Sequence, residues 1–435
     1  MKRRDLLKIS AGAIVAGTGA SSLIGCSSAP AINTNKLAVA RVVVVGGGPG
    51  GISTAQAIKA TNPAIDVTIV ERNAKYTTCF ASNWVFADVA TMDDITFGYN
   101  TLKKKHKIAV VQGEVTGIDA DKRIVNLANG EYLEYDRLVV SPGISFRWDT
   151  IEGLDESTST TIAHAWKAGP QTALLKKQLN AMPHDGTFVM CAPPNPFRCP
   201  PGPYERASMV ATYLKKNKPK AKLIILDAKD KFSKFGLFKE GWRKHYGFES
   251  DNAIIDWVSK SKGGAVKAVD AKTKTITTMD GEKIKADVIN YIPAQKASNT
   301  AVAMGLVNAS GWCPIDQETF ESTMIKNVHV LGDASIAKPM PKSGFSADSQ
   351  GKLCGAAVAN LLSGKSVNAN ARLANQCFSL VAPTYGISVA AGYKLDGDHH
   401  IAKTGGGLFP RDGNFVGEAQ SAHSWYTNIT ASLFK

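Results

Sequence analysis

Two short runs of β-branched residues, at 41–45 and 66–70, flank a stretch at 52–61 whose composition suits a helix. An uninterrupted apolar run of about five residues is typical of a strand that is buried on both faces of a parallel sheet. The spacing therefore predicts a strand–helix–strand unit at the start of the globular part of the chain.

Similar runs at 138–140, 186–191, 222–227 and 328–330 predict further buried strands. A helix is predicted to begin near Pro203, because proline is tolerated in the first turn of a helix. Strands that alternate with helices indicate an α/β fold with parallel sheets. The length of 435 residues leaves room for about three domains.

A glycine-rich turn joins the first predicted strand to its helix. Gly46 allows a tight turn, Gly48 lets a pyrophosphate approach the backbone, and Gly51 lets helix and strand pack closely. Glu71 ends the second strand about 20 residues later, where a carboxylate accepts hydrogen bonds from a ribose. The combination predicts a dinucleotide-binding unit rather than a glycine-rich turn of another α/β fold.

The second predicted unit lacks such a turn. Its first strand, at 186–191, runs into a proline-rich segment, 192–203, that contains Cys199. Prolines have no N–H group to bind a pyrophosphate and cannot adopt the positive φ of a glycine turn. We therefore do not expect a nicotinamide dinucleotide to be the electron donor.

Residues 1–31 are predicted to be an export signal. A pair of arginines precedes a run rich in glycine and alanine at 9–25, as in a twin-arginine signal. This run falls short of the roughly 20 solidly apolar residues that cross a bilayer, so no transmembrane segment is expected. The expected location is the periplasm, where disulfides are stable. Residues 23–26 also resemble a lipoprotein cleavage box, in which Cys26 would carry a lipid anchor; cleavage near 29–31 is the alternative.

The formal net charge of the chain is +14, and its basic residues are scattered along the sequence. A nucleic-acid-binding surface would instead cluster them on one stripe with aromatic side chains between them, so no nucleic-acid partner is expected. An acidic protein partner or an anionic substrate agrees with the sign of the charge.

Seven cysteines are the main candidates for chemistry: Cys26, Cys79, Cys191, Cys199, Cys313, Cys354 and Cys377. No Cys-x-x-Cys-His motif occurs, so the chain is expected to attach no haem, and no Cys-x-x-Cys pair indicates a metal site. Cys191, Cys313 and Cys377 are expected to be small buried residues.

Several motifs resemble those of glutathione reductase-like flavoproteins, and in particular those of the flavoprotein subunit of flavocytochrome c sulfide dehydrogenase. They are the glycine-rich turn and the segments 76–83, 138–143, 197–206, 331–333 and 343–354. The resemblance runs from about residue 42 to the C-terminus. It implies an α/β architecture of glutathione reductase type with two Rossmann-like βαβ domains and a C-terminal α+β interface region.

The resemblance also implies the domain boundaries. An FAD-binding domain that is split in the sequence covers 38–152 and 305–365. A second Rossmann-like domain, without a loop for NAD, covers 153–304, and the interface region covers 366–435.

FAD is the cofactor in the family that these motifs resemble. The resemblance places Asp333 at the ribityl chain of the flavin and implies a thioether between Cys79 and the flavin ring; a nearby buried thiol is the alternative for Cys79. The remaining residues expected to bind the cofactor are Arg72, Ser141, Gly143, Gly332 and Ser346.

The resemblance further implies that Cys199 and Cys354 form a redox disulfide facing the flavin. A sulfide anion would attack one sulfur, and the freed thiolate would pass two electrons to FAD. A structural disulfide or a pair of buried thiols is the alternative. Glu205 either moves protons or is an acid placed favourably near a helix N-terminus.

The resemblance implies that the substrate is a small reduced sulfur compound and that the acceptor is a c-type cytochrome subunit. Two alternatives remain open. A sulfide:quinone oxidoreductase would pass electrons to a membrane quinone, but such enzymes use amphipathic C-terminal helices, whereas 404–426 is polar and rich in glycine. A flavin-bearing accessory protein of a sulfur-oxidising complex would use its thiols on a protein partner.

Overall fold

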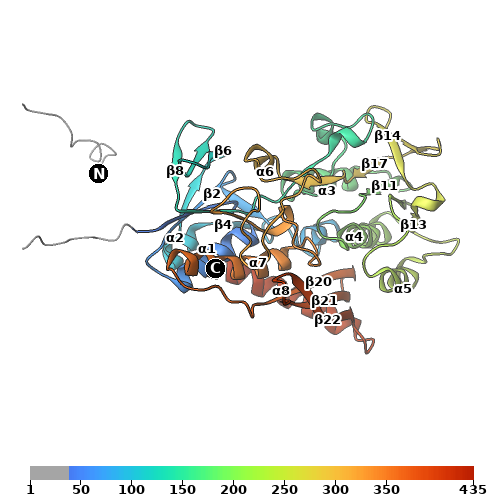
Figure 1. Ribbon diagram of the computed structural model, residues 1–435. Helices are drawn as coiled ribbons and strands as arrows, with labels where there is room; N and C mark the ends of the chain where they lie inside the picture. Colours follow the sequence, from blue (N-terminus) through green and yellow to red (C-terminus); the bar gives the residue numbers. More distant parts are fainter. Residues whose placement is uncertain (1–38) are drawn as a thin grey trace, which may run out of the picture. The chain divides into compact units, whose positions relative to one another are not determined.

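The computed structural model describes residues 39–435. The predicted export signal and Cys26 lie outside the described residues. Two parallel sheets, each covered by helices, and a separate antiparallel sheet near the C-terminus form the described part of the chain (Figure 1). The predicted α/β fold is thereby confirmed.

The first sheet has five parallel strands in the order β19-β9-β1-β2-β5. They are β19 (Val328–Val330), β9 (Arg137–Val140), β1 (Arg41–Val45), β2 (Asp66–Glu71) and β5 (Ala109–Gln112). Because β19 comes from far along the chain, segments distant in the sequence build this sheet together. The central strand β1 buries Val42–Val45 completely, as its uninterrupted apolar run predicts.

Helices α1 (Pro49–Thr61) and α7 (Gly344–Leu362) lie side by side against this sheet (Figure 1). Their backbones touch at two glycines of α7. A Cβ atom on Gly351 would lie 2.5 Å from the Gly50 carbonyl oxygen, and one on Gly355 would lie 2.5 Å from the Thr54 carbonyl oxygen. Only glycine fits at these positions, so the two helices pack in a single register.

The second sheet has four parallel strands in the order β13-β12-β11-β17. They are β13 (Ile255–Val258), β12 (Lys222–Asp227), β11 (Thr187–Ala192) and β17 (Val288–Tyr291). Helices α3 (Pro170–Ala181), α4 (Gly202–Asn217) and α5 (Phe235–Tyr246) belong to this part of the chain. As predicted, proline stands in the first turn of α4.

The C-terminal region is an antiparallel sheet followed by a long helix. The sheet contains β20 (Arg372–Ala382), β21 (Tyr385–Leu395) and β22 (Ile401–Phe409), and α8 (Phe415–Phe434) packs against it. β20 also contacts α4 and α7. This sheet therefore lies against both parallel-sheet units.

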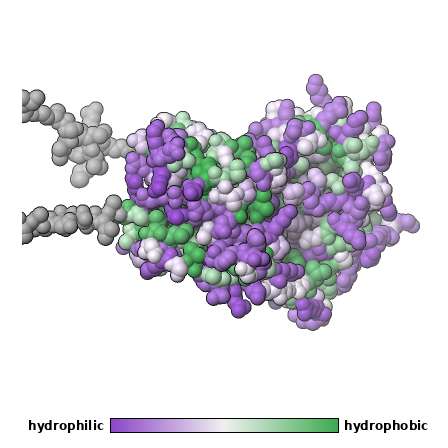
Figure 2. Space-filling view, in the orientation of Figure 1, coloured by the Kyte–Doolittle hydropathy of each residue, from purple (hydrophilic) through white to green (hydrophobic). Residues whose placement is uncertain are grey.

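The remaining elements are short. The strands are β3 (Lys75–Thr77) with β4 (Thr96–Gly98), β6 (Val115–Asp119) with β7 (Ile124–Leu127) and β8 (Tyr132–Glu134), β10 (Ile144–Phe146) with β18 (Gln295–Ala297), and β14 (Val266–Asp270) with β15 (Thr275–Thr278) and β16 (Lys283–Lys285). The helices are α2 (Asn100–His106), α6 (Asn299–Ala303) and the 3-10 helices η1 (Ser82–Ala87), η2 (Trp148–Thr150), η3 (Ser157–Thr160), η4 (Lys260–Lys262) and η5 (Gly332–Ala334). On the face shown in Figure 2, hydrophilic side chains spread over the surface and hydrophobic ones show in patches between them. Within residues 39–435, no helix is both long and apolar enough to cross a bilayer.

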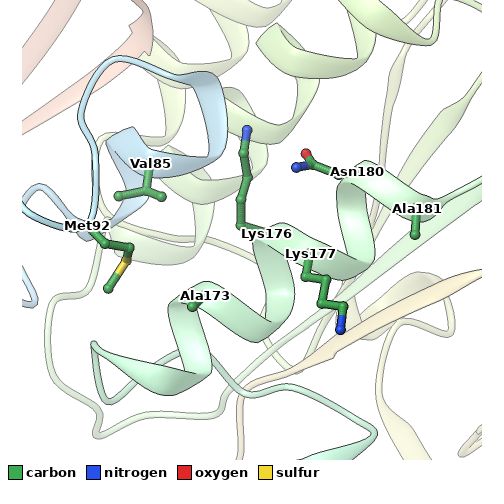
Figure 3. A pocket seen from close by; sticks show the side chains of 7 residues that line it. All are labelled: Val85, Met92, Ala173, Lys176, Lys177, Asn180 and Ala181. Carbon is green, nitrogen blue, oxygen red and sulfur yellow. The ribbon is translucent and has the colours of Figure 1, made fainter.

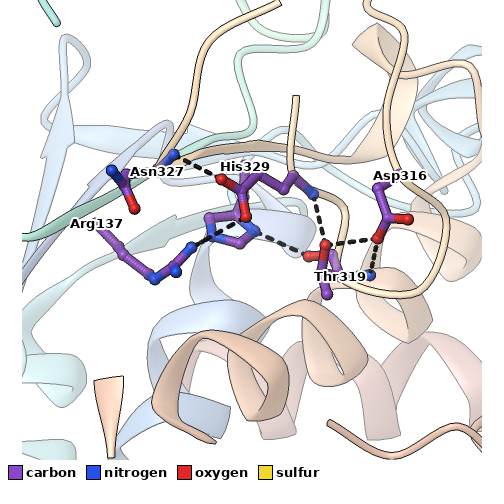
Figure 4. A network of polar contacts seen from close by, with 6 residues as sticks. Arg137, Asp316, Thr319, Asn327 and His329 are labelled. Carbon is purple, nitrogen blue, oxygen red and sulfur yellow. Dashed lines mark hydrogen bonds and ion pairs between the residues drawn. The ribbon is translucent and has the colours of Figure 1, made fainter. Parts of the chain in front are cut away.

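A buried polar network connects β9 to β19 (Figure 4). The Nδ1 atom of His329 lies 2.9 Å from the Thr319 carbonyl oxygen, and its Nε2 atom lies 3.0 Å from an Arg137 nitrogen. Because a carbonyl only accepts and a guanidinium only donates, Nδ1 carries the proton and Nε2 accepts. Arg137 also pairs with Glu321 at 3.2 Å. Burial lowers the pKa of His329 to about 4.

We expect acid to destabilise the protein through His329. Between the ordinary pKa of 6.5 and about 4, the unfolded chain binds a proton that the folded protein does not, so up to about 3 kcal/mol of stability is lost as the pH falls. The measurement is the unfolding free energy of the wild type and His329→Gln at neutral pH and near pH 4.5. The variant should lose less stability between the two; equal losses would contradict the expectation.

Candidate functional site

The residues expected to bind the cofactor gather at one edge of the first sheet. The glycine-rich turn follows β1, Glu71 ends β2, residues 141–143 follow β9, and residues 332–333 follow β19. Because these strands are parallel, their carboxyl ends share one edge, where α/β folds bind nucleotides.

The glycine-rich turn leaves no room for side chains. Gly46 has a φ of +105°, and a Cβ atom on it would lie 2.3 Å from the Ser141 carbonyl oxygen. A Cβ atom on Gly51 would lie 1.9 Å from the Gly46 carbonyl oxygen. Gly48 precedes α1 without a capping side chain, so the first N–H groups of this helix are available to an anion such as a pyrophosphate.

The Glu71 carboxylate lies beside this turn. Its Oε2 atom accepts the Gly47 N–H at 2.8 Å, and its Oε1 atom accepts the Asn73 N–H at 2.9 Å. These bonds hold the carboxylate at the end of β2, from which ribose hydroxyls are bound in such folds. The next residue, Arg72, is exposed.

Asp333 carries a buried acceptor atom that has no partner. Its Oδ1 atom is inaccessible and accepts no hydrogen bond within the described chain, whereas Oδ2 lies 3.8 Å from an Arg198 nitrogen. Burial raises the pKa of Asp333, and the nearby Arg198 and Lys342 charges counteract this rise. A buried acceptor without a partner costs about 1–3 kcal/mol, so the atom fits a hydroxyl donor of a bound nucleotide such as a ribityl chain.

Arg198 joins Asp333 to Cys79. An Arg198 nitrogen donates to the Cys79 sulfur at 3.0 Å, and the same nitrogen donates to the Trp166 carbonyl. The cysteine is half-buried, directly ahead of η1. Cys79 and Asp333, which are 254 positions apart, therefore belong to one cluster around a single guanidinium.

The other expected cofactor residues take different positions. The Ser141 hydroxyl lies beside the turn, 2.6 Å from where a Cβ atom on Gly50 would stand. Gly143 has a φ of +70° and open space around it. The Ser346 side chain instead donates to Asn375 Oδ1 at 3.1 Å, next to Cys377.

Cys199 lies at the corresponding edge of the second sheet, in the proline-rich segment after β11. Its backbone is left-handed, with a φ of +52°, and its N–H donates to the Lys342 carbonyl at 2.6 Å. A Cβ atom on Gly202 would lie 2.9 Å from the Cys199 sulfur, so this glycine makes room for the thiol.

Cys377 lies near Cys199, because it lines a cavity together with Pro200 and Pro201, the two residues that follow Cys199. Burial raises the pKa of Cys199, the Cys377 and Glu205 charges add to this rise, and the Arg198 and Lys234 charges oppose it. Cys377 is half-buried on β20, which packs against α4, the helix that begins just after Cys199. No disulfide joins any two cysteines of residues 39–435 in the structure.

The structure contradicts the predicted pairing of Cys199 with Cys354. Cys354 is fully buried on α7, in the apolar cluster that contains Val44 and Ile52, whereas Cys199 packs against a different cluster. Burial raises the pKa of Cys354, and the charge that acts on it is Arg137. At 3.6 residues per helical turn, the packing of Gly351 and Gly355 against α1 directs Cys354 towards the sheet, away from the proline-rich segment.

Cys377 is the residue that the sequence prediction missed. The expectation that it is a small buried residue is wrong, although the same expectation is confirmed for Cys191 and Cys313. One signal was present: Asn375, Cys377 and Ser379 alternate along a strand and so share one face.

Glu205 connects three segments of the site. Its Oε2 atom accepts the Asn83 amide at 2.9 Å, and its Oε1 atom accepts the Trp84 indole N–H at 3.2 Å and the Leu380 N–H at 3.0 Å. Burial raises the pKa of Glu205, and the bonds from Asn83 and Leu380 oppose this rise. The carboxylate thus joins the Cys79 segment, the Cys199 helix and the Cys377 strand.

From these contacts we expect Glu205 to act as a positioning residue. In Glu205→Gln one carboxylate oxygen becomes an NH₂ group, which would face the donors that now bind the carboxylate. The Asn83 side chain cannot turn its oxygen towards this NH₂ group, because that oxygen already accepts a hydrogen bond from Arg206. We expect unfolding free energy to fall by about 1–3 kcal/mol. Chemical denaturation measures this loss, and Glu240→Gln, at an exposed position, is the control. A stable variant whose pH–rate profile alone changes would instead identify Glu205 as a proton carrier.

The carboxyl edge of the second sheet is filled by its own side chains. Asp227, at the end of β12, is fully buried and accepts hydrogen bonds from Tyr204 at 2.6 Å, Trp257 at 3.1 Å and Lys229 at 2.6 Å. The Phe232 ring stacks on Tyr204 with a centroid distance of 3.5 Å. These contacts leave the carboxylate no free position for a ribose.

Two cavities lie near the candidate site, one beside the η1 region and one beside Cys377. The larger, about 560 Å³, lies between the η1 region and α3 and is lined by Val85, Met92, Ala173, Lys176, Lys177, Asn180 and Ala181 (Figure 3). The smaller, about 160 Å³, opens on Cys377 between Pro200–Pro201 and the C-terminal sheet. Only the smaller one reaches a cysteine. No three metal-ligating side chains are grouped within the described residues.

Three family models match the chain. "Pyridine nucleotide-disulphide oxidoreductase" matches residues 40–177, "Sulfide dehydrogenase [flavocytochrome c] flavoprotein chain, central" matches residues 172–293, and "Flavocytochrome c sulphide dehydrogenase, flavin-binding" matches residues 369–434. The flavin-binding match covers the sheet that carries Cys377 and implies that the cofactor is FAD.

Curated relatives include enzymes named for sulfide and quinone. Mitochondrial sulfide:quinone oxidoreductase of Dictyostelium discoideum is 24% identical over 349 residues, which are 75% of this chain and 71% of the relative. Sulfide-quinone reductase of Aquifex aeolicus is 26% identical over 311 residues, which are 69% of this chain and 70% of the relative.

A solved structure shares the fold. The sulfide:quinone oxidoreductase from Aquifex aeolicus has a TM-score of 0.70 at 18% identity, over 90% of this chain and 91% of that chain. The chain is therefore a flavoprotein of the pyridine nucleotide-disulphide oxidoreductase superfamily, and its central and C-terminal parts are those of the flavocytochrome c sulfide dehydrogenase flavoprotein family.

Proposed function

We propose that this protein oxidises sulfide through a disulfide between Cys199 and Cys377 and passes the electrons to FAD. One observation carries the proposal: Cys377 lines the 160 Å³ cavity together with Pro200 and Pro201, which follow Cys199, while Arg198, which precedes Cys199, pairs with Asp333. A redox-active cysteine pair needs access for a small anion and contact with an electron acceptor. The cavity supports the first requirement, and the nearby Arg198–Asp333 cluster, where the flavin would bind, supports the second.

The placement assigns different roles to the two sulfurs. Cys377 lines the cavity, so it is the sulfur that hydrosulfide reaches. The new S–S bond forms at Cys377, the Cys199–Cys377 bond breaks, and Cys199 leaves as a thiolate with the bonding pair. Arg198, whose charge lowers the pKa of the Cys199 thiol against the effect of burial, favours this leaving group.

FAD, when bound, accepts the electron pair from the sulfur chemistry. Glu71 and the glycine-rich turn would hold its ribose and pyrophosphate, and Asp333 Oδ1 would accept a ribityl hydroxyl. We propose a thioether between Cys79 and the flavin, because Arg198 holds this sulfur in the same cluster as Asp333. A covalent bond would keep the cofactor in place during electron transfer.

For the acceptor we propose a c-type cytochrome in the periplasm. The matches to flavocytochrome c models support this choice, and the net charge of +14 suits an acidic partner. A membrane quinone is the alternative, favoured by the relatives. One feature disfavours a quinone: α8 buries Ala422, Ile429 and Leu433 against the protein body, so this face is not available to a bilayer.

Anaerobic mixing with sulfide tests the proposal. We expect rapid bleaching of the flavin absorbance, followed by faster reoxidation with a c-type cytochrome than with a soluble ubiquinone analogue. Failure of sulfide to bleach the flavin would exclude sulfide oxidation. Faster reoxidation by the quinone would identify a sulfide:quinone oxidoreductase, and bleaching that needs a protein partner would favour the accessory role.

A further inference from the structure

Two donor groups lie close to Cys377, which lines the 160 Å³ cavity. The Lys234 ammonium donates to the Cys377 carbonyl at 2.9 Å and to the Ser379 hydroxyl at 2.9 Å. The Asn375 amide nitrogen lies 3.5 Å from the Cys377 sulfur. Neither donor belongs to the residues that bind the cofactor or carry the reacting sulfurs.

The orientation of the Asn375 amide follows from its neighbours. Its oxygen accepts the hydroxyls of Ser343 at 2.5 Å and Ser346 at 3.1 Å. Two donors on the oxygen leave the NH₂ group to face the Cys377 sulfur. The oxygen also lies 3.6 Å from that sulfur, so a protonated thiol can donate to the amide and an anionic sulfur can accept from it.

Lys234 carries a positive charge, and all its hydrogen-bond partners are neutral groups. It is 4% exposed, precedes α5 with a left-handed φ of +62°, and bonds two carbonyls and one hydroxyl rather than a carboxylate. Burial lowers the pKa of Lys234 to about 8, and the surrounding charges of Cys377, Glu205, Cys199 and Glu418 oppose this fall. The ammonium therefore stays charged at neutral pH.

We propose that Lys234 and Asn375 form an anion site for the sulfur carried by Cys377. The anion is the thiolate of the reduced pair or the terminal sulfur of the persulfide that hydrosulfide forms there; the second identity rests on the proposed function. After the exchange, the persulfide loses its proton to solvent through the cavity, and its negative charge lies next to the amide and the ammonium. Both are positioning residues, because they act on the sulfur without exchanging electrons with it.

Alkylation of Cys377 tests the site without sulfide or turnover. The parent is the full-length flavoprotein with Cys199→Ser, which is reduced so that Cys377 is a free thiol. Iodoacetamide then modifies Cys377 at a series of pH values, and mass spectrometry of the Cys377 peptide measures the extent of modification at each pH. Because only the thiolate reacts, Lys234→Met should move the profile upward by about one pH unit and slow alkylation at neutral pH by about tenfold. Lys234→Arg should restore the parent profile.

Two further variants separate charge from structure. Ser379→Ala removes one partner of Lys234 but keeps its charge, so the profile should not move. Asn375→Asp keeps an acceptor for both serine hydroxyls but replaces the donor by a carboxylate, so the profile should move upward. If Lys234→Met does not fold, Lys234→Gln takes its place as the variant without the charge, and Asn375→Asp tests the amide separately.

An unchanged profile in Lys234→Met, or equal shifts in Lys234→Met and Lys234→Arg, would overturn the role of the charge. An unchanged profile in Asn375→Asp would overturn the role of the amide. The proposed function fails separately: its failure is the absence of flavin bleaching by sulfide in the protein with both cysteines, whatever the alkylation profile.

Discussion

Cys199→Ser and Cys377→Ser each abolish the bleaching of the flavin by sulfide, with an expected loss of at least about 10³-fold in rate, whereas Cys354→Ala leaves the rate unchanged. The reason is geometric. Hydrosulfide needs an S–S bond to attack, and Cys377 lines the cavity together with the residues that directly follow Cys199. Cys354 fills the apolar space between α7 and the first sheet, so its removal costs packing but no chemistry.

Rapid-mixing absorbance measures these rates, and the disulfide itself supplies an independent check. Proteolysis of the oxidised protein should yield a linked peptide pair that contains Cys199 and Cys377, and Cys354→Ala should yield the same pair. A linked pair of Cys199 and Cys354 would contradict the structure. Full activity in Cys377→Ser would exclude the proposed disulfide altogether.

Cys79→Ala should convert a flavin that stays on the denatured chain into one that is released completely. Cys79 belongs to the cluster around Arg198, with the unpaired Asp333 oxygen that fits the ribityl chain. In the variant, Arg198 keeps its contacts to Asp333 and the Trp166 carbonyl, so the cofactor site should persist. We therefore expect flavin in the native variant and none on the denatured band.

Flavin fluorescence on a denaturing gel measures this all-or-none difference. Cys313→Ala, which removes a fully buried sulfur outside that cluster, is the control and should keep the fluorescent band. A fluorescent band in Cys79→Ala would assign the bond to another residue. Release of all flavin from the denatured wild type would exclude a covalent link.

The cofactor site illustrates what local patterns can predict. The turn at Gly46–Gly51 and the acid at Glu71 have fixed spacings because one strand–turn–helix unit positions them, so their geometry depends on nearby residues. Asp333 was also expected from its motif. Its link to Cys79 through Arg198 was not, because no pattern along the chain relates three segments that meet only after folding.

The cysteine pair illustrates the opposite case. Cys354 stands in a motif-rich segment and Cys377 does not, yet β20 rather than α7 delivers the second sulfur. The direction of the Cys354 side chain depends on how α7 is rotated about its own axis. The packing of Gly351 and Gly355 against α1 determines that rotation. Strand alternation places Cys377 on the same face as Asn375 and Ser379, but only the docking of β20 onto α4 brings it to Cys199.

The sequence by itself determined the α/β class, the parallel strands, the nucleotide-binding turn and the loss of a second such turn, because each depends on residues within one supersecondary unit. Tertiary structure alone decided which thiols meet, that Glu205 joins three segments, and that Lys234 and Asn375 flank Cys377. These contacts join positions far apart in the sequence, such as Glu205 and Leu380, which are 175 residues apart. Their partners are selected by how whole elements pack, and a local pattern carries no information about that packing.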